Sequence, residues 1–261
     1  MPLSLLQSIV RTCVAATKPT RQRRSAAGLR SREATMGLES LEQRMALTVA
    51  APSIRLAAAS DTGVLGDGIT RLARPVFSGI ASPRSSVVVY ADGQLVGITT
   101  ATVRGAWSLA TPAARPLTTG AHTMTAYAVG AGSVWSTATP MWMAVDPTPP
   151  TASLTYDSVN GRATVTFSEP VSGVRASKLI LSGRTESGVV IPNVAINDVR
   201  ARPYVGLITM SQSSDGRTFT FQEQLTLAEP GTYTLSFVKT GVVDRAGNPL
   251  AAGASVSFTI I

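Results

Sequence analysis

Four aspartates lie in loop segments whose composition suits either a hard cation or a tight turn. Asp61 and Asp67 stand in SDTGVLGDGIT, Asp146 begins DPTPPT, and Asp244 lies in GVVDRAGNPLA. Carboxylate and carbonyl oxygens are the ligands that Ca²⁺ prefers in proteins. However, no segment has the D-x-[DN]-x-[DN]-G spacing of a dedicated calcium loop, and TRLARPVF places two arginines nearby. These four residues are therefore only weak calcium candidates. We expect no cofactor, with calcium as the one alternative.

The segment GVVDRAGNPLA is better explained as a turn. The Asp244 carboxylate can accept hydrogen bonds from the backbone amide of Ala246 or Gly247, as in an Asx-turn. Gly247 and Asn248 tolerate a positive φ, and Pro249 fixes the exit of the chain. We expect a structural turn here, with a bound cation as the alternative.

The chain offers little for catalysis. His122 is the one histidine, and no G-x-S-x-G nucleophile motif accompanies it. Carboxylate pairs for glycoside hydrolysis would have to come from residues that are not neighbours in sequence: Glu169, Glu223, Glu229 and Asp244. The single cysteine, Cys13, excludes an intramolecular disulfide and a zinc site built on cysteines. We expect no enzyme.

Aromatic side chains near turns or edges could form a platform for a sugar ring. The weak candidates for such a carbohydrate site are Trp135, Trp142 and Tyr204. Aromatic residues make up only 5% of the chain, and two cores need large side chains. We therefore expect most of the aromatic residues to be buried.

Alternating apolar and polar residues predict that these loops are carried by β-strands. SSVVVYADGQLVGITTATVRGAWSLATP indicates three strands, with Asp92-Gly93 forming the first hairpin turn. AHTMTAYAV and STATPMWMAVD continue the series, with Pro140 at an edge or bulge. GRATVTFSEPV, GRTFTFQEQLTL, GTYTLSFVKT and ASVSFTII form a second series. The fold class is all-β, with two tandem sandwiches over residues 52–147 and 150–261.

The Pro-rich segment DPTPPT separates the two series and stiffens the connection between them. Residues 1–50 differ from the rest, because they hold eight Arg and Lys against three acids and lack strand periodicity. We predict a disordered targeting segment that ends in a short helix. The basic tail lacks interleaved aromatics, so no nucleic acid partner is expected. No run of 18 apolar residues predicts a transmembrane segment.

Several segments resemble known bacterial families. DTGVLGDGIT, PVFSGIASPRSSVVVYADGQLVGITTA, GAWSLATP and GAHTMTAYAV resemble the Ig-like repeats of large adhesins. VTFSEPV, GTYTLSF and VVDRAGNPLA resemble a second Ig-like type found in S-layer-associated proteins. LEQRMAL, within residues 38–48, resembles the LEPR-XLL motif of bacterial surface proteins and suggests Met36 as the natural start.

These resemblances imply two Ig-like sandwiches in an exported, extracellular or cell-surface protein. Some adhesin repeats of this kind bind calcium at domain junctions, which adds to the interest of the aspartates. We expect a non-enzymatic structural or adhesive module that acts as a spacer or a weak multivalent binder. Its partners would be surface proteins or polysaccharides. The alternative is an accessory carbohydrate-binding module.

Overall fold

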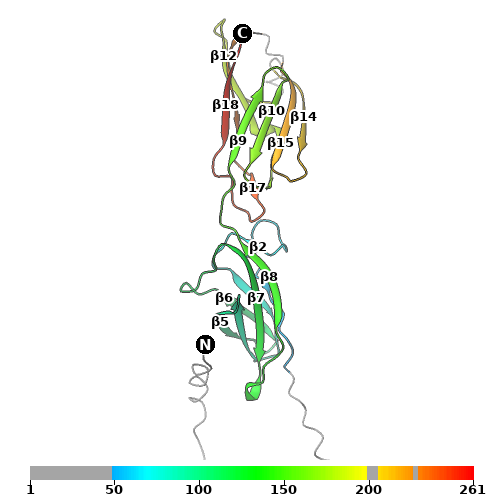
Figure 1. Ribbon diagram of the computed structural model, residues 1–261, viewed down its shortest axis with the longest axis vertical. Helices are drawn as coiled ribbons and strands as arrows, with labels where there is room; N and C mark the ends of the chain where they lie inside the picture. Colours follow the sequence, from blue (N-terminus) through cyan, green and yellow to red (C-terminus); the bar gives the residue numbers. More distant parts are fainter. Residues whose placement is uncertain (1–48, 199–204, 226–228) are drawn as a thin grey trace, which may run out of the picture. The chain divides into compact units, whose positions relative to one another are not determined.

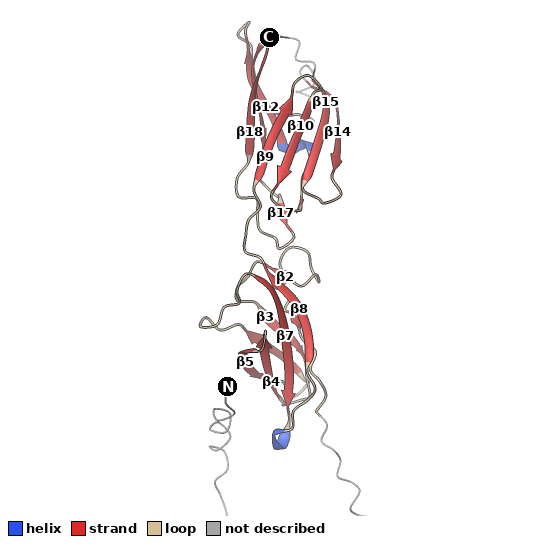
Figure 2. Ribbon diagram, viewed as in Figure 1, coloured by secondary structure: helices blue, strands red, loops and turns tan. Residues whose placement is uncertain are grey.

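The computed structural model describes residues 49–198, 205–225 and 229–261, which all belong to one compact unit of the chain. The predicted N-terminal segment, its helix, the LEPR-XLL-like motif at 38–48 and Tyr204 lie outside the described residues. The described residues form strands and two short 3₁₀ turns, η1 (Ala131–Ser133) and η2 (Ala176–Lys178) (Figure 2). The prediction of an all-β protein is therefore confirmed. No helix among these residues is long and apolar enough to cross a membrane.

The first sandwich is made of two antiparallel layers (Figure 1). The smaller layer has the order β1-β3-β6, with bounds Arg55–Leu56, Val76–Ile80 and Ala106–Ala110. The larger layer has the order β2-β8-β7-β4-β5, with bounds Ile69–Thr70, Thr139–Val145, Gly120–Val129, Ser86–Ala91 and Gln94–Thr100. Only β2 pairs in parallel, with the end of β8, which leaves Pro140 on an unpaired edge as predicted.

The second sandwich also has two antiparallel layers. One has the order β14-β15-β10-β9, with bounds Val205–Gln212, Thr218–Leu225, Arg162–Phe167 and Ala152–Asp157. The other has the order β13-β12-β16-β18, with bounds Val190–Ala195, Leu179–Thr185, Gly231–Phe237 and Ala254–Ile260. A short pair, β11 (Val171–Ser172) and β17 (Val243–Asp244), lies at one end.

Alternation along the strands builds each core. In the first sandwich Phe77 of β3 and Trp107 of β6 face Val87, Met124 and Met143 of the larger layer, and all five are buried. Because β-strand side chains alternate between faces, Thr123, Thr125 and Tyr127 of β7 then point to the outer face of the larger layer. This outer face carries the exposed aromatic residues of the first sandwich.

The second core is filled by phenylalanines. Phe167, Phe219, Phe221 and Phe237 are buried, and Phe167 contacts Phe219 and Phe237 edge-to-face, with ring centroids 5.8 and 5.7 Å apart. Such pairs add about 0.5–1.5 kcal/mol beyond the burial of area. Most phenylalanines are thus buried in the two cores, and most of the exposed aromatic surface comes from Tyr and Trp.

The Asp92-Gly93 hairpin forms as the sequence predicts. Both residues have positive φ, 49° and 79°, which is the type I′ geometry that matches the twist of the paired strands β4 and β5. The turn also positions chemistry, because the Asp92 carboxylate reaches across to β7 and accepts a hydrogen bond from the Thr123 amide at 2.8 Å.

Candidate functional site

Asp244 and the loop that follows β17 make a group of buried hydrogen bonds in the segment that the sequence predicts to be a turn. Asp244 is 2% exposed, and its Oδ1 accepts a hydrogen bond from the Asn248 amide while its Oδ2 accepts one from Asn248 Nδ2, both at 2.8 Å. The sequence-based expectation of a structural turn is met, but the partner is Asn248 and not Ala246 or Gly247. The Gly247 amide instead donates to the main-chain carbonyl of Asp244. Gly247 has φ +85°, whereas Asn248 does not use a positive φ.

The main-chain carbonyls of this loop accept hydrogen bonds from residues 62–71 of the first sandwich. Thr62 Oγ1 donates to the Ala246 carbonyl at 2.6 Å, and the Val64 amide donates to the Arg245 carbonyl at 3.1 Å. Arg71 Nη1 donates to the carbonyl of Gly247 at 2.9 Å. Because carbonyls accept all three bonds, the contact depends on the backbone path of the loop more than on its side chains.

Two further bonds use side chains of the loop itself, those of Arg245 and Asn248. Arg245 Nε lies 2.8 Å from Asp67 Oδ2, and this aspartate side chain is only 8% exposed. Asn248 Nδ2 also donates to the main-chain carbonyl of Asp146 at 2.7 Å. Asn248 thus bonds both Asp244 and the chain that leaves the first sandwich. We call these five bonds the junction contact.

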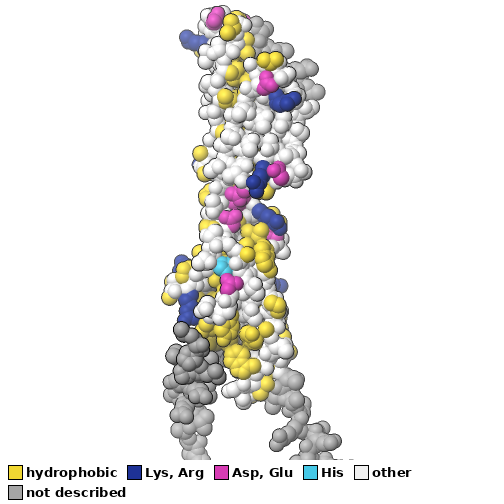
Figure 3. Space-filling model, in the orientation of Figure 1, with side chains coloured by type: hydrophobic (Ala, Val, Ile, Leu, Met, Phe, Trp, Pro, Cys, Tyr) yellow, Lys and Arg dark blue, Asp and Glu magenta, His cyan; other side chains and the backbone are white. Residues whose placement is uncertain are grey.

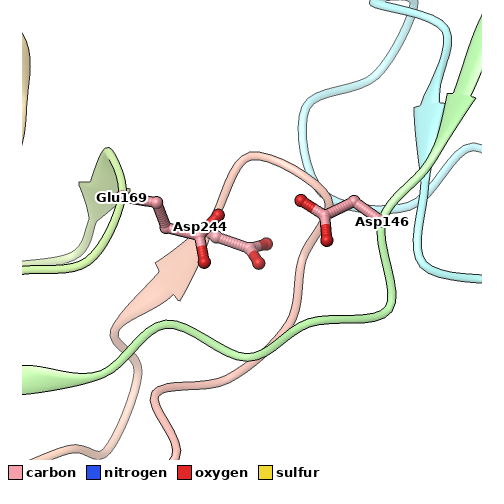
Figure 4. Close-up of side chains that lie close together, drawn as sticks. All are labelled: Asp146, Glu169 and Asp244. Atoms are coloured by element: carbon pink, nitrogen blue, oxygen red, sulfur yellow. The ribbon is translucent and has the colours of Figure 1, made fainter. Parts of the chain in front are cut away.

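Three carboxylates gather beside the junction contact (Figure 4). Oxygens of Asp146, Glu169 and Asp244 lie within 4.8 Å of one another. Burial raises the pKa of Glu169, and the negative charges of Asp244 and Asp146 raise it further, while Arg217 acts in the opposite direction. Sequence reasoning missed Glu169 as a member, because the turn after β10 and the loop after β17 meet only in the folded protein.

The fit of this cluster to a cation is limited. Three carboxylates carry six oxygens, the lower limit of the roughly six to eight that Ca²⁺ takes, and only if every one is free to bind. Both oxygens of Asp244 already accept hydrogen bonds, and Asp146 Oδ1 accepts one from the Thr148 amide. Asp61 and Asp67 lie outside the cluster: Asp61 accepts from the Gly66 amide and Asp67 from the Ile69 amide. Calcium therefore stays a prediction that the structure does not require.

His122 lies near the start of β7, where both of its ring nitrogens have partners. Its Nδ1 lies 2.6 Å from Asp92 Oδ2 and its Nε2 lies 2.8 Å from the Thr118 carbonyl. A neutral imidazole has one N–H, so two acceptor partners require the doubly protonated ring. Burial lowers the pKa of His122, but the bonds to Thr118 and Asp92 outweigh it and leave the pKa above its usual 6.5. Both ring nitrogens are therefore engaged within the protein.

The two predicted sugar-binding tryptophans lie on different elements of the first sandwich: Trp135 in the turn after β7, and Trp142 on β8. Trp135 is 45% exposed and meets Tyr127 edge-to-face, with centroids 5.8 Å apart; Tyr127 meets Tyr90 in the same way at 5.9 Å. Trp142 is 55% exposed on β8, cross-strand from Thr123. Tyr90 and Tyr127 were missed in the sequence, although strand alternation places both on the outer face.

Comparison with protein families explains the two sandwiches. Residues 48–147 match a family described as "Bacterial Ig-like domain", and residues 139–260 match a second family with the same description. The chain carries two bacterial Ig-like domains in tandem. The junction contact therefore joins the two Ig-like domains, and Asp146 lies where their matches overlap.

The solved structures to which this chain is similar are distant in sequence. A tetra-tandem repeat in the extending region of a large adhesion protein is 15% identical, with a TM-score of 0.30, over 81% of this chain and 49% of that chain. A 1.5-MDa bacterial ice-binding adhesin is 13% identical, with a TM-score of 0.38, over 80% and 64%. Fibronectin(III)-like modules of Clostridium thermocellum CbhA are 15% identical, with a TM-score of 0.30, over 80% and 94%. The chain thus spans about half of the first structure and under two thirds of the second. Comparison with curated proteins gives no match.

Proposed function

We propose that the two Ig-like domains form a non-enzymatic structural module of the bacterial cell surface or extracellular matrix, which acts as a spacer. The observation that carries this proposal is the junction contact. Domains joined by a flexible linker alone would move independently, whereas five hydrogen bonds and ion pairs between them favour one arrangement. The exposed, Thr-rich outer faces of the sheets would add weak, multivalent contacts with neighbouring surface molecules.

Two glycines make the junction contact possible. Gly63 has φ +74°, and a methyl group on it would collide with the Arg245 carbonyl. A methyl group on Gly247 would lie 2.7 Å from the amide nitrogen of Gly63. The two backbones therefore approach more closely than any side chain would allow. Gly66, in the same loop as Gly63, also has a positive φ (+83°), but a methyl group there would meet nothing within 4 Å.

These glycines provide a matched test. Gly63→Ala and Gly66→Ala carry a similar φ penalty, of about 1 kcal/mol, but only Gly63→Ala separates the loops. Residual dipolar couplings measured in a weakly aligned sample report whether the two domains share one orientation. We expect the alignment tensors of the domains to agree in the wild type and in Gly66→Ala, and to diverge in Gly63→Ala.

The proposal has two ways to be wrong. Divergent tensors in the wild type, or identical behaviour of the two glycine variants, would show that the junction contact does not hold the domains. Fractionation of producing cells tests the location separately, because a surface module should be recovered from the envelope or the medium. Recovery from the cytoplasm alone would contradict the surface role and leave the junction result untouched.

A further inference from the structure

We infer that the first Ig-like domain carries a carbohydrate-binding site on the outer face of its larger sheet, made by the aromatic corner Tyr90, Tyr127 and Trp135. Nothing in the spacer role requires such a site. In the view of Figure 3, hydrophobic side chains gather over the lower part of the first domain. Three rings that meet edge-to-face on a strand surface form a firm apolar wall, since each ring fixes the next.

The aromatic corner encloses a depression of about 290 Å³. Its lining residues are Tyr90, Gly93, Thr125, Tyr127 and Trp135. This volume lies at the lower end of the range for small-molecule sites, roughly 300–1,000 Å³, so the depression suits a ring-sized group. A stable protein–protein interface uses roughly 20–30 residues on each side, whereas five residues line this depression.

The chemistry of the lining selects an uncharged, amphipathic ligand. None of the five lining residues carries a charge. Asp92, next to Gly93, bonds His122 and the Thr123 amide instead. In the part of the chain that the structure describes, the hydroxyls of Tyr90, Thr125 and Tyr127 hold no hydrogen bond with another protein group, so they are available to a ligand. A neutral pyranose matches this set, because its C–H face packs on an aromatic ring while its hydroxyls bond at the rim.

Trp135 is held in place by the turn that presents it. Val129 and Trp135 form an isolated β-bridge across this turn, and Gly130 donates its amide to the Val134 carbonyl at 2.9 Å. The buried Ser136 hydroxyl accepts from the Ala128 amide at 2.9 Å and donates to the Thr137 carbonyl at 2.8 Å. An indole that is 45% exposed is therefore fixed before any ligand arrives, which lowers the entropy lost on binding.

The same outer face continues toward Trp142. This indole lies on β8 opposite Thr123, four residues along β7 from Tyr127. At about 3.3 Å per residue, the two positions are separated by roughly 13 Å along the strand. A polysaccharide chain, longer than one sugar, can therefore contact the aromatic corner and Trp142 at once. We expect the natural ligand to be such a neutral polymer.

Affinity electrophoresis of the full chain tests this inference. Native gels would contain laminarin, xylan, dextran, mannan or hydroxyethylcellulose, with alginate as the acidic probe and casein as the protein probe. We expect at least one neutral polysaccharide to retard the wild type. Trp135→Ala should weaken that retardation about tenfold, as expected for the loss of one stacked ring, while Trp135→Phe keeps most of it. Trp142→Ala should have a smaller effect in the same direction.

Val159→Ala is the matched control, because Val159 is 91% exposed in the second domain and far in sequence from the site. It should leave retardation unchanged. The thermal midpoint of Trp135→Ala, measured alongside, shows whether the variant is folded, and Trp135→Phe keeps the test valid if it is not. Retardation by none of the neutral polysaccharides, by alginate or casein alone, or equally in the wild type and both Trp135 variants would overturn the site. The orientation of the domains is measured separately, so either proposal can fail alone.

Discussion

Single residues in this protein show their roles through the partners they satisfy. His122 is 7% exposed, and its two ring nitrogens lie beside two acceptors, the Asp92 carboxylate and the Thr118 carbonyl. Asp244 and Asn248 are both buried, and two hydrogen bonds join them, from the Asn248 amide and Nδ2 to the two carboxylate oxygens of Asp244. A buried polar group that loses its partner costs about 1–3 kcal/mol. Both positions should therefore respond sharply to substitution, although neither is placed for chemistry.

The stability of the first domain should depend on pH through His122. Its pKa is raised above 6.5 in the folded state, so the stabilisation is complete below that pH and is lost as the pH rises through the folded value. Asp92 has a lowered pKa because it accepts bonds from the Thr123 amide and from His122, so its contribution is lost only as the pH falls below 3.8. The pair is therefore fully effective between about pH 4 and 6.5.

A comparison of the wild type with His122→Gln isolates this effect. The difference in free energy of unfolding should shrink by about 1.5 kcal/mol, the worth of one charge-assisted bond, between about pH 6 and pH 9. Urea unfolding monitored by tryptophan fluorescence at several pH values measures it. A difference that stays constant over this range would mean that His122 is neutral in the folded protein.

Asp244→Ala should destabilise the second domain by roughly 2 kcal/mol, because it leaves the Asn248 amide without its acceptor in a buried turn. Asp215→Ala is the control, since Asp215 accepts similar turn bonds from the Arg217 amide and Ser213 but lies fully in solvent. Its effect should be much smaller. Thermal unfolding followed by circular dichroism gives both values, and equal midpoints for the two variants would refute the structural role of Asp244.

Strands and turns with a local signal were predictable. The alternation of Ala163, Val165 and Phe167 predicted the buried face of β10, and Asp92-Gly93 predicted the hairpin, since period-two patterns and positive-φ residues act within a few positions. The sequence analysis named no strand over β12 to β14. There Gly183 falls at a register shift and two segments lack clean alternation. Bulges break the period that reveals a strand.

The candidate sites were less predictable, because their members come from distant segments. Asp146 and Asp244 were singled out one by one, but the approach of Glu169 depends on the folding of the second domain. Trp135 was identified by its position near a turn, whereas its contact with Tyr127 depends on the bridge between Val129 and Trp135. Sequence spacing does not report such contacts.

The turn that presents Trp135 supplies a prediction about one element. Ser136→Ala removes the acceptor of the Ala128 amide and the donor to the Thr137 carbonyl. The turn should loosen, the domain should lose about 1 kcal/mol of stability, and acrylamide should quench tryptophan fluorescence more strongly. Ser108→Ala is a control, because Ser108 is exposed on β6 and its side chain makes no hydrogen bond among the described residues. Unchanged quenching in Ser136→Ala would show that this serine does not order Trp135.

The whole module should fold without calcium. The three clustered carboxylates provide few free oxygens, and Asp67 is neutralised by Arg245. Scanning calorimetry in millimolar calcium and in excess EGTA should therefore give the same unfolding midpoint. A higher midpoint in calcium that disappears in Glu169→Gln would reverse this expectation and identify the cluster as a cation site.

The junction contact also dictates an order of events during synthesis. Four of its five bonds join residues 176 to 184 apart in the chain, and the fifth, between Asn248 and Asp146, joins residues 102 apart. In every bond one partner lies in the loop that precedes β18. Strands of the first domain end at Val145, so this domain can close while the second is still being made. Until residues 244–248 have been made, the donors of residues 62–71 are hydrogen-bonded to water. The junction contact therefore forms only after residues 244–248 have been made, and the first domain can fold as a separate unit before then.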